Sequence, residues 1–123
     1  MDIWQVRDVA MALPEVSEDF PFDEHTLVMR VMDKIFLLMN VQKEPASVNL
    51  KCEPERAIEL RARYEAVLPG YHMNKRHWNT VMLGQDVRPE LMRELIEHSY
   101  ERVVAGLKKA DREKIRAMRE GKG

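Results

Sequence analysis

The order of helix-like and strand-like stretches predicts an α+β domain with a mostly antiparallel sheet and helices packed on one face. Strand-like stretches are bunched between helix-like ones, in the order helix, three strands, helix, one or two strands, helix. The 123 residues make one domain of ordinary size, long enough to bury a core without disulfides. We expect one face of the sheet to pack on the helices and the other to face water.

Three helices are predicted from apolar spacing and from residues that suit helix ends. Asp2 suits the cap of the first, whose apolar residues before Pro14 are Ile3, Val6, Ala10 and Leu13. Pro54 suits the first turn of the second, which carries on one face Ala57, Leu60, Arg61 and Tyr64. Pro89 begins the third, whose apolar stripe consists of Met92, Leu95, Ile96, Ser99, Val103 and Leu107.

The first two predicted strands form a tight hairpin. Residues 25–31 and 34–40 are rich in apolar and β-branched side chains, and only Met32 and Asp33 separate them. Asp33 tolerates turn conformations, although the strong Asn-Gly signal is missing. Residues 15–24 before the hairpin are acidic and interrupted by prolines, so we expect a loop there.

Two further strands are predicted from period-two alternation, over residues 46–52 and 77–83. The apolar face of the first consists of Val48, Leu50 and Cys52, and its other face of Ser47, Asn49 and Lys51. One face of the second consists of Asn79, Val81 and Leu83, and the other of Trp78, Thr80 and Met82. Between them, Pro69-Gly70 marks a turn, and residues 71–74 fit either a loop or a short strand.

Composition excludes several classes of protein. The single cysteine, Cys52, excludes an internal disulfide and a multi-cysteine zinc site, and it fits a reducing cytoplasm. The longest apolar run, residues 35–39, is far shorter than the roughly 20 residues of a membrane span. None of the common phosphate-binding, zinc-protease or nucleophile-elbow motifs occurs. We therefore expect a cytoplasmic protein that is not an enzyme and holds no metal or cofactor.

Charge is distributed unevenly along a chain whose net charge is −1. Residues 1–24 hold seven acids and one base, whereas residues 108–123 hold seven bases and three acids. We assign residues 1–107 to a single domain and residues 108–123 to a charged extension, helical or frayed. The extension is compatible with a basic segment that binds nucleic acid or an acidic partner. It is also compatible with a solvent-exposed helix of mixed charge, and its three acids favour this second interpretation.

Several phrases of the sequence occur together in one known family. They are FPFDEHTLVMRV, DKIFLLMNV, PGYHMNKRHWNTVML and HSYERVVAGL. On these motifs the chain resembles the MmcQ/YjbR family over residues 1 to about 110. The most specific pattern, H-x-N-K-x-H-W, falls on His72, Asn74, Lys75, His77 and Trp78. The resemblance implies a fold like that of the frataxin/CyaY sandwiches and a DNA-binding role with two hairpin wings.

The residues of the shared pattern also suit nucleic acid by their own chemistry. The segment 66–85 contains no acid, and we expect Lys75 and Arg76 to contact phosphates beside a stacking Trp78. Further candidates for this interface are His72, Asn74, Lys51 and Lys43. In the competing structural reading, Trp78 is a large residue half covered by its neighbours. The side chains that then brace the turn after Pro69-Gly70 are His72, Asn74 and Lys75.

Two other functions remain open. A protein-interaction module would use the same sheet face. A frataxin-like metal binder would use the acidic segment that contains Glu15, Glu18, Asp19, Asp23 and Glu24, provided that these carboxylates converge. The spacing of Cys52 relative to His72 and His77 does not support a catalytic pair of a cysteine nucleophile and a histidine base. A lone cysteine is usually a small buried hydrophobic side chain.

Overall fold

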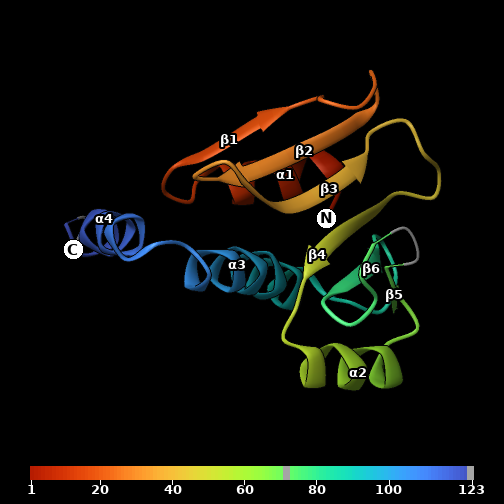
Figure 1. Ribbon diagram of the computed structural model, residues 1–123. Helices are drawn as coiled ribbons and strands as arrows, with labels where there is room; N and C mark the ends of the chain where they lie inside the picture. The colour runs from red at the N-terminus through yellow and green to blue at the C-terminus, as the bar shows by residue number, and fades with distance from the viewer. Residues whose placement is uncertain (71–72, 122–123) are drawn as a thin grey trace.

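The computed structural model describes residues 1–70 and 73–121 and contains one six-stranded sheet (Figure 1). The strands lie in the order β1-β2-β3-β4-β6-β5, and every neighbouring pair is antiparallel. Their bounds are β1 Val16–Asp19, β2 Thr26–Val31, β3 Lys34–Asn40, β4 Ser47–Lys51, β5 Val67–Pro69 and β6 Trp78–Met82. The predicted α+β class and its antiparallel sheet are confirmed.

Four helices in the described part of the chain accompany the sheet: α1 Ile3–Met11, α2 Pro54–Arg63, α3 Pro89–Ala105 and α4 Lys109–Glu120. Helix α3 packs against β2, β3 and β4, α1 packs on α3 and β1, and α2 packs beside β5. In Figure 1, α4 lies at the end of α3 that is remote from α2. All four helices contribute to a single apolar core, so the sheet is covered on one face.

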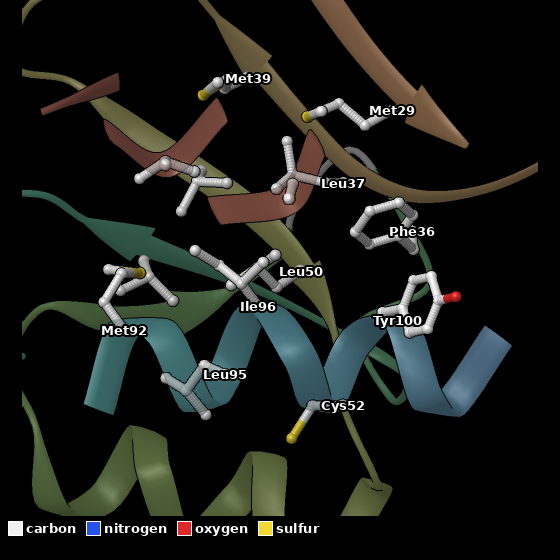
Figure 2. Close-up of a cluster of buried hydrophobic side chains, with 14 of the residues drawn as sticks. Met29, Phe36, Leu37, Met39, Leu50, Cys52, Met92, Leu95, Ile96 and Tyr100 are labelled. Atoms are coloured by element: carbon white, nitrogen blue, oxygen red, sulfur yellow. The ribbon is translucent and has the colours of Figure 1, made fainter. Parts of the chain in front are cut away.

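The alternation of β4 and β6 places their side chains as the sequence predicts. Val48 and Leu50 of β4 are buried in the core, and so are Asn79 and Val81 of β6. Figure 2 shows Leu50 and Leu37 converging with Ile96 of α3 on the helix-covered face. Burying a side chain of this size stabilises the folded state by about 2 kcal/mol. This apolar layer therefore stabilises the packing of the helices on the sheet face opposite the water-facing one.

A β-bulge in β3 brings an aromatic pair into the core. The register between β2 and β3 shifts so that Phe36 has no partner residue in β2. Its ring packs edge-to-face on Tyr100 of α3, with ring centroids 5.5 Å apart and planes at 84°. Tyr100 is fully buried, yet the predicted stripe of α3 did not include it.

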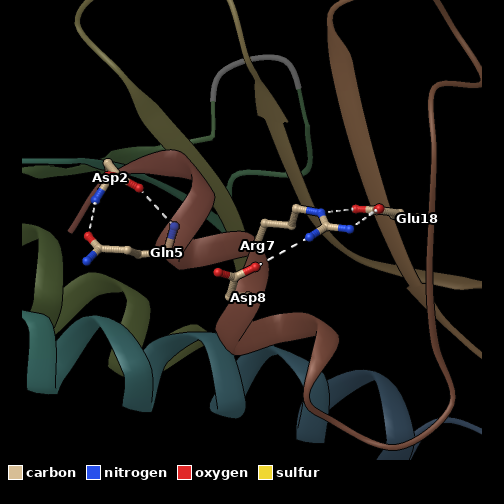
Figure 3. A network of polar contacts seen from close by, with 5 residues as sticks. All are labelled: Asp2, Gln5, Arg7, Asp8 and Glu18. Atoms are coloured by element: carbon tan, nitrogen blue, oxygen red, sulfur yellow. Dashed lines mark hydrogen bonds and ion pairs between the residues drawn. The ribbon is translucent and has the colours of Figure 1, made fainter.

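Two strands lie where none was expected. Residues 16–19 belong to β1, which pairs with β2 at the edge of the sheet, so the prediction of a loop over residues 15–24 was wrong there. The acids that suggested a loop are tolerated because edge side chains reach solvent or an ion pair. Arg7 of α1 binds Glu18 through two hydrogen bonds (Figure 3). Strand β5 ends at Pro69, where only a turn was predicted.

The predicted hairpin turn is present, and the backbone angles of its two central residues show how it forms without glycine. Met32 and Asp33 both adopt positive φ, 48° and 69°. Positive φ at both central residues is typical of the two-residue turn that matches strand twist, and Asp is one of the residues that tolerate it.

Helix α1 ends at Met11, one turn before the predicted limit at Pro14.

Candidate functional site

The water-facing side of the sheet changes character along β4 and β6. At one end Lys51 stands opposite Trp78, in the middle Asn49 stands opposite Thr80, and at the other end Ser47 stands opposite Met82. The two ends of β4 are about 13 Å apart, given the rise of a strand. One end is therefore cationic and aromatic, whereas the rest is largely neutral.

The loop before β6 holds exposed cations on a hydrogen-bonded turn. The side-chain oxygen of Asn74 accepts the N–H of Arg76 at 3.0 Å, and its carbonyl accepts the N–H groups of His77 and Trp78. Asn74 thus braces the turn, as its structural reading predicted. Lys75 and Arg76 are exposed at its tip.

A further cation joins this turn from α2. The guanidinium of Arg61 donates to the carbonyl of Lys75 at 2.9 Å, a contact that the sequence did not predict. We call the group made of Lys51, Arg61, Lys75 and Arg76 the cationic edge.

Trp78 lies half-buried beside the cationic edge, on the water-facing side of β6. Gly70 makes its position possible, because a Cβ added at Gly70 would lie 3.1 Å from both the Cβ and the carbonyl oxygen of Trp78. The N–H of Gly70 also donates to that carbonyl at 3.0 Å. Trp78 is therefore neither sealed in the core nor fully free, and one part of its indole remains accessible.

Other predicted interface residues lie elsewhere or outside the described residues. Lys43 is in the loop between β3 and β4, near the Ser47 end of β4 and remote from the cationic edge. A cation outside the predicted set, Arg30 of the first hairpin, binds Asp19 at 3.3 Å, and this carboxylate on the same face of the sheet offsets its charge. His72 lies outside the residues that the structure describes.

A groove of about 660 Å³ crosses the neutral part of the water-facing side. Its apolar lining comes from five separate parts of the chain and includes Phe22, Leu38, Leu68, Met73 and Met82. The sequence analysis did not predict the groove. It did place Met82 on the same face of its strand as Trp78 and Thr80, which indicated an apolar side chain on the water-facing side. Grooves of this volume are typical of small-molecule sites.

The polar lining of the groove divides into two parts. On the floor, the hydroxyl of Thr80 donates to the side-chain oxygen of Asn49 at 2.6 Å. At the end near the β3–β4 loop lie Asn40, Lys43 and Ser47. The described lining of the groove contains one lysine and no carboxylate, and the Asp23 carboxylate lies beside it, bound to the lining residue Thr26.

The acidic segment does not form a shared site. Glu18 binds Arg7 and Asp19 binds Arg30, while Asp23 accepts the N–H and the hydroxyl of Thr26. The hydrogen bond from Arg7 lowers the pKa of Glu18. Within residues 1–70 and 73–121, no group of three or more His, Cys, Asp or Glu side chains is placed to hold a metal ion.

Cys52 is buried in the core, and burial raises the pKa of its thiol. Its N–H donates to the carbonyl of His77 at 2.8 Å, which ties β4 to the turn before β6. A protonated, buried thiol is a structural side chain and a weak nucleophile.

The basic extension packs back on the domain as α4. Ile115 is fully buried, and Arg119 binds Glu97 at 2.7 Å and lies 5.6 Å above the centre of the Tyr100 ring. Lys114 approaches Glu15 within 3.8 Å. These contacts fit the reading of a charged helix better than that of a free cationic hook.

Known proteins resemble the chain over most of its length. The family model described as YjbR matches residues 11–102. The uncharacterized protein YbdF of Escherichia coli O157:H7 is 36% identical over 110 residues, covering 89% of this chain and 90% of that protein. The uncharacterized protein YjbR of Escherichia coli K12 is 30% identical over 104 residues, covering 85% and 88% of the two chains.

Solved structures support the same fold. The crystal structure of Deinococcus radiodurans protein DR2400 superimposes with a TM-score of 0.85 at 39% identity, covering 92% of this chain and 86% of that one. A crystal structure of a Pseudomonas syringae protein gives a TM-score of 0.71 at 30% identity, covering 82% and 97% of the two chains. Within the described ranges, no helix is both long enough and apolar enough to cross a bilayer.

Proposed function

We propose that this chain, which belongs to the YjbR family, binds DNA through the water-facing side of its sheet. The observation that carries the proposal is the cationic edge, where side chains from β4, α2 and the turn before β6 gather beside Trp78. No acid occurs in residues 66–85, so this turn carries no carboxylate of its own to repel phosphate. The edge therefore brings four cations to one side of a chain whose net charge is −1.

Each residue of the edge has a distinct role in the proposed complex. Lys75 and Arg76 contact phosphates from the tip of the turn, and Arg61 and Lys51 extend the contact along the sheet. Trp78 offers the accessible part of its indole to a base or sugar, a contact that tolerates any sequence. Asn74 positions the turn, and Lys43 is too remote to share the same phosphates.

The proposed role is binding without catalysis, in the cytoplasm. A single buried cysteine with a raised thiol pKa is compatible with that reducing compartment. The proposal needs no cofactor and no metal, because the side chains of the edge act through their own charges.

Salt-dependent binding to a labelled duplex tests the proposal. We compare the native chain with a Lys75→Gln/Arg76→Gln variant and with Lys108→Gln/Lys109→Gln, which removes the same charge from the exposed start of α4. Fluorescence anisotropy at several salt concentrations gives the slope of log affinity against log salt. Removal of two phosphate contacts should reduce this slope by about two units in the first variant only.

Two results would contradict the proposal. The first is a native chain that fails to bind duplex at low salt. The second is an equal loss in both variants, or a loss confined to the α4 variant, since either would separate binding from the cationic edge. Circular dichroism of each variant confirms that the fold is intact.

A protein partner on the same face is the second candidate. Phe22, which is 66% exposed, and Leu68 give this face apolar contact area that phosphate does not need. Binding through these side chains would be much less sensitive to salt than binding to DNA. A Phe22→Ser variant that keeps duplex affinity but loses a captured protein would favour this candidate.

A further inference from the structure

We propose that the groove on the water-facing side binds a small organic monocarboxylate with an apolar body. The proposal is independent of DNA binding, because the groove lies over the neutral part of the sheet and the cationic edge lies at its other end. It rests on three polar side chains at one end of the groove and an apolar lining along the rest.

The three polar side chains come together because of the β3–β4 hairpin. Leu38 pairs with Asn49, so the antiparallel register carried two residues further sets Asn40 opposite Ser47. In the loop between these two residues, the N–H of Lys43 donates to the carbonyl of Asn40 at 3.4 Å. All three side chains line the same end of the groove, which we call the donor corner: Asn40, Lys43 and Ser47.

Each side chain of the donor corner has a hydrogen-bond donor to offer. The side-chain oxygen of Asn40 accepts the N–H of Gln42 at 2.9 Å, which leaves its NH₂ group for a ligand. Ser47 is 8% exposed and lines the groove, and none of the described hydrogen bonds involves its hydroxyl. Its O–H is therefore a donor that an acceptor in the groove can reach. Lys43 adds a positive charge.

The donors select an anion of single charge. A carboxylate offers acceptor lone pairs to all three groups at once, and charge-assisted hydrogen bonds are the stronger kind. One lysine offsets one negative charge, which suits a monocarboxylate better than a polyphosphate. The floor of the groove does not require further polar groups on the ligand, because the side chains of Thr80 and Asn49 already bind each other.

The remaining lining selects an apolar body. Leu38, Leu68 and Met82 face the groove from three different strands, and Leu68 is 37% exposed. Methionine side chains adapt to ligands of different shape, so Met73 and Met82 tolerate either a chain or a ring. Covering this surface with an apolar ligand removes apolar area from water, which favours binding. The ligand is therefore amphipathic, with its charge at the donor corner.

Titration with decanoate tests the proposal, with decanol as the uncharged probe of the same body. Chemical shifts of a ¹⁵N-labelled chain report affinity and location together. We expect decanoate to shift the amides of Ser47, Leu68 and Met82, and decanol to bind about tenfold more weakly. Lys43→Gln should weaken decanoate about tenfold and leave decanol unchanged.

Lys34→Gln is the matched control, because Lys34 is exposed at the β2–β3 turn and does not line the groove. It should leave decanoate affinity unchanged. The proposal is overturned if decanoate shifts no groove amide, if decanol binds as tightly as decanoate, or if the two lysine variants weaken decanoate equally. Because neither probe is a nucleic acid, each of these results is independent of whether the cationic edge binds DNA.

Discussion

The hydroxyl of Ser99 accepts a hydrogen bond from the N–H of Lys51 at 2.8 Å and donates one to the carbonyl of Phe36. The ladder between β3 and β4 stops at this point: Leu37 pairs with Leu50, but the next pair along, Phe36 and Lys51, is not directly paired. A fully buried helix side chain therefore completes the sheet. It also fixes the backbone of Lys51, one of the four residues of the cationic edge.

Ser99→Ala should destabilise the domain by about 2 kcal/mol, because it leaves a buried N–H and a buried carbonyl without this partner. Urea unfolding monitored by circular dichroism measures the change. Ser17→Ala, at an exposed position of β1, is the control and should change stability by less than about 0.5 kcal/mol. Equal effects of the two variants would show that Ser99 does not bridge the strands.

His98 makes the stability of α2 sensitive to pH. Its Nε2 accepts the N–H of Glu53, the N-cap residue of α2, at 3.1 Å, which requires a neutral ring. Burial, together with the charge of Arg56, lowers the pKa of His98 from its ordinary value of 6.5. Below about pH 6.5, His98 is therefore protonated more readily in the unfolded chain than in the folded one. Because protonation then favours the unfolded state, the free energy of unfolding should fall as the pH drops below about 6.5.

Denaturant unfolding between neutral pH and about pH 5 measures this dependence, above the range in which carboxylates titrate. His98→Gln keeps an acceptor for the N–H of Glu53 but cannot be protonated there. The variant should lose the pH dependence in this window. A native chain whose stability is flat across the window would contradict the assignment.

Tyr100 should produce the opposite dependence at high pH. Its hydroxyl donates to the carbonyl of Pro14 at 2.7 Å, and burial raises the pKa of Tyr100 to about 12. The unfolded chain ionises near the ordinary value of 10, so stability should fall as the pH rises from about 10 to about 12. Tyr100→Phe should abolish this fall and cost about 1 kcal/mol at neutral pH. Unfolding curves at several pH values measure both effects, and an unchanged high-pH profile in the variant would refute the role of Tyr100.

Gly70→Ala should separate β5 from β6 at Trp78. The added Cβ would meet the Cβ and carbonyl oxygen of Trp78 at 3.1 Å, and a backbone oxygen within a sheet has little room to move. We expect a loss of about 1–3 kcal/mol in unfolding free energy and a change in tryptophan fluorescence. Gly106→Ala is the control, because the nearest atom there is 3.5 Å away at negative φ. A Gly70→Ala variant as stable as the control would show that the contact is relaxed without cost.

The water-facing side of β4 and β6 was predictable because alternation is a local property. It placed Lys51 and Trp78 on the same face, and their register pairing confirms it. Strand β1 was not predictable from its acids, because what makes Glu18 acceptable in a strand is Arg7, which lies eleven residues earlier. Tyr100 was missed because only the bulge at Phe36 creates a place for its ring.

The groove and the full cationic edge depend on contacts distant in sequence. Leu38 and Leu68 share a groove only because the strand order places β6 between β4 and β5. Arg61 was predicted to share a helix face with Ala57 and Leu60, and nothing in that pattern indicates that its guanidinium reaches the carbonyl of Lys75. Neither relationship has a local sequence signal, so both required the tertiary structure.

Asn79 combines burial with poor hydrogen bonding, which predicts an unusual substitution effect. It is 2% exposed, its side-chain oxygen has no partner among the described residues, and its NH₂ group reaches the carbonyl of Ala57 only at 3.4 Å. That carbonyl also accepts from the Nε of Arg61 at 3.2 Å, so it keeps a donor when the amide is removed. The neighbouring cavity of about 10 Å³ is lined mainly by apolar side chains.

Asn79→Leu should therefore leave stability unchanged or raise it by up to about 1 kcal/mol, since a side chain of similar size replaces an unsatisfied buried amide. Asn79→Ala provides the comparison, because it removes the same polar group but leaves a void, which should cost about 2 kcal/mol. Urea unfolding of the two variants separates the polar contribution from the packing contribution. If Asn79→Leu is as destabilising as Asn79→Ala, the amide makes a hydrogen bond that the fold requires.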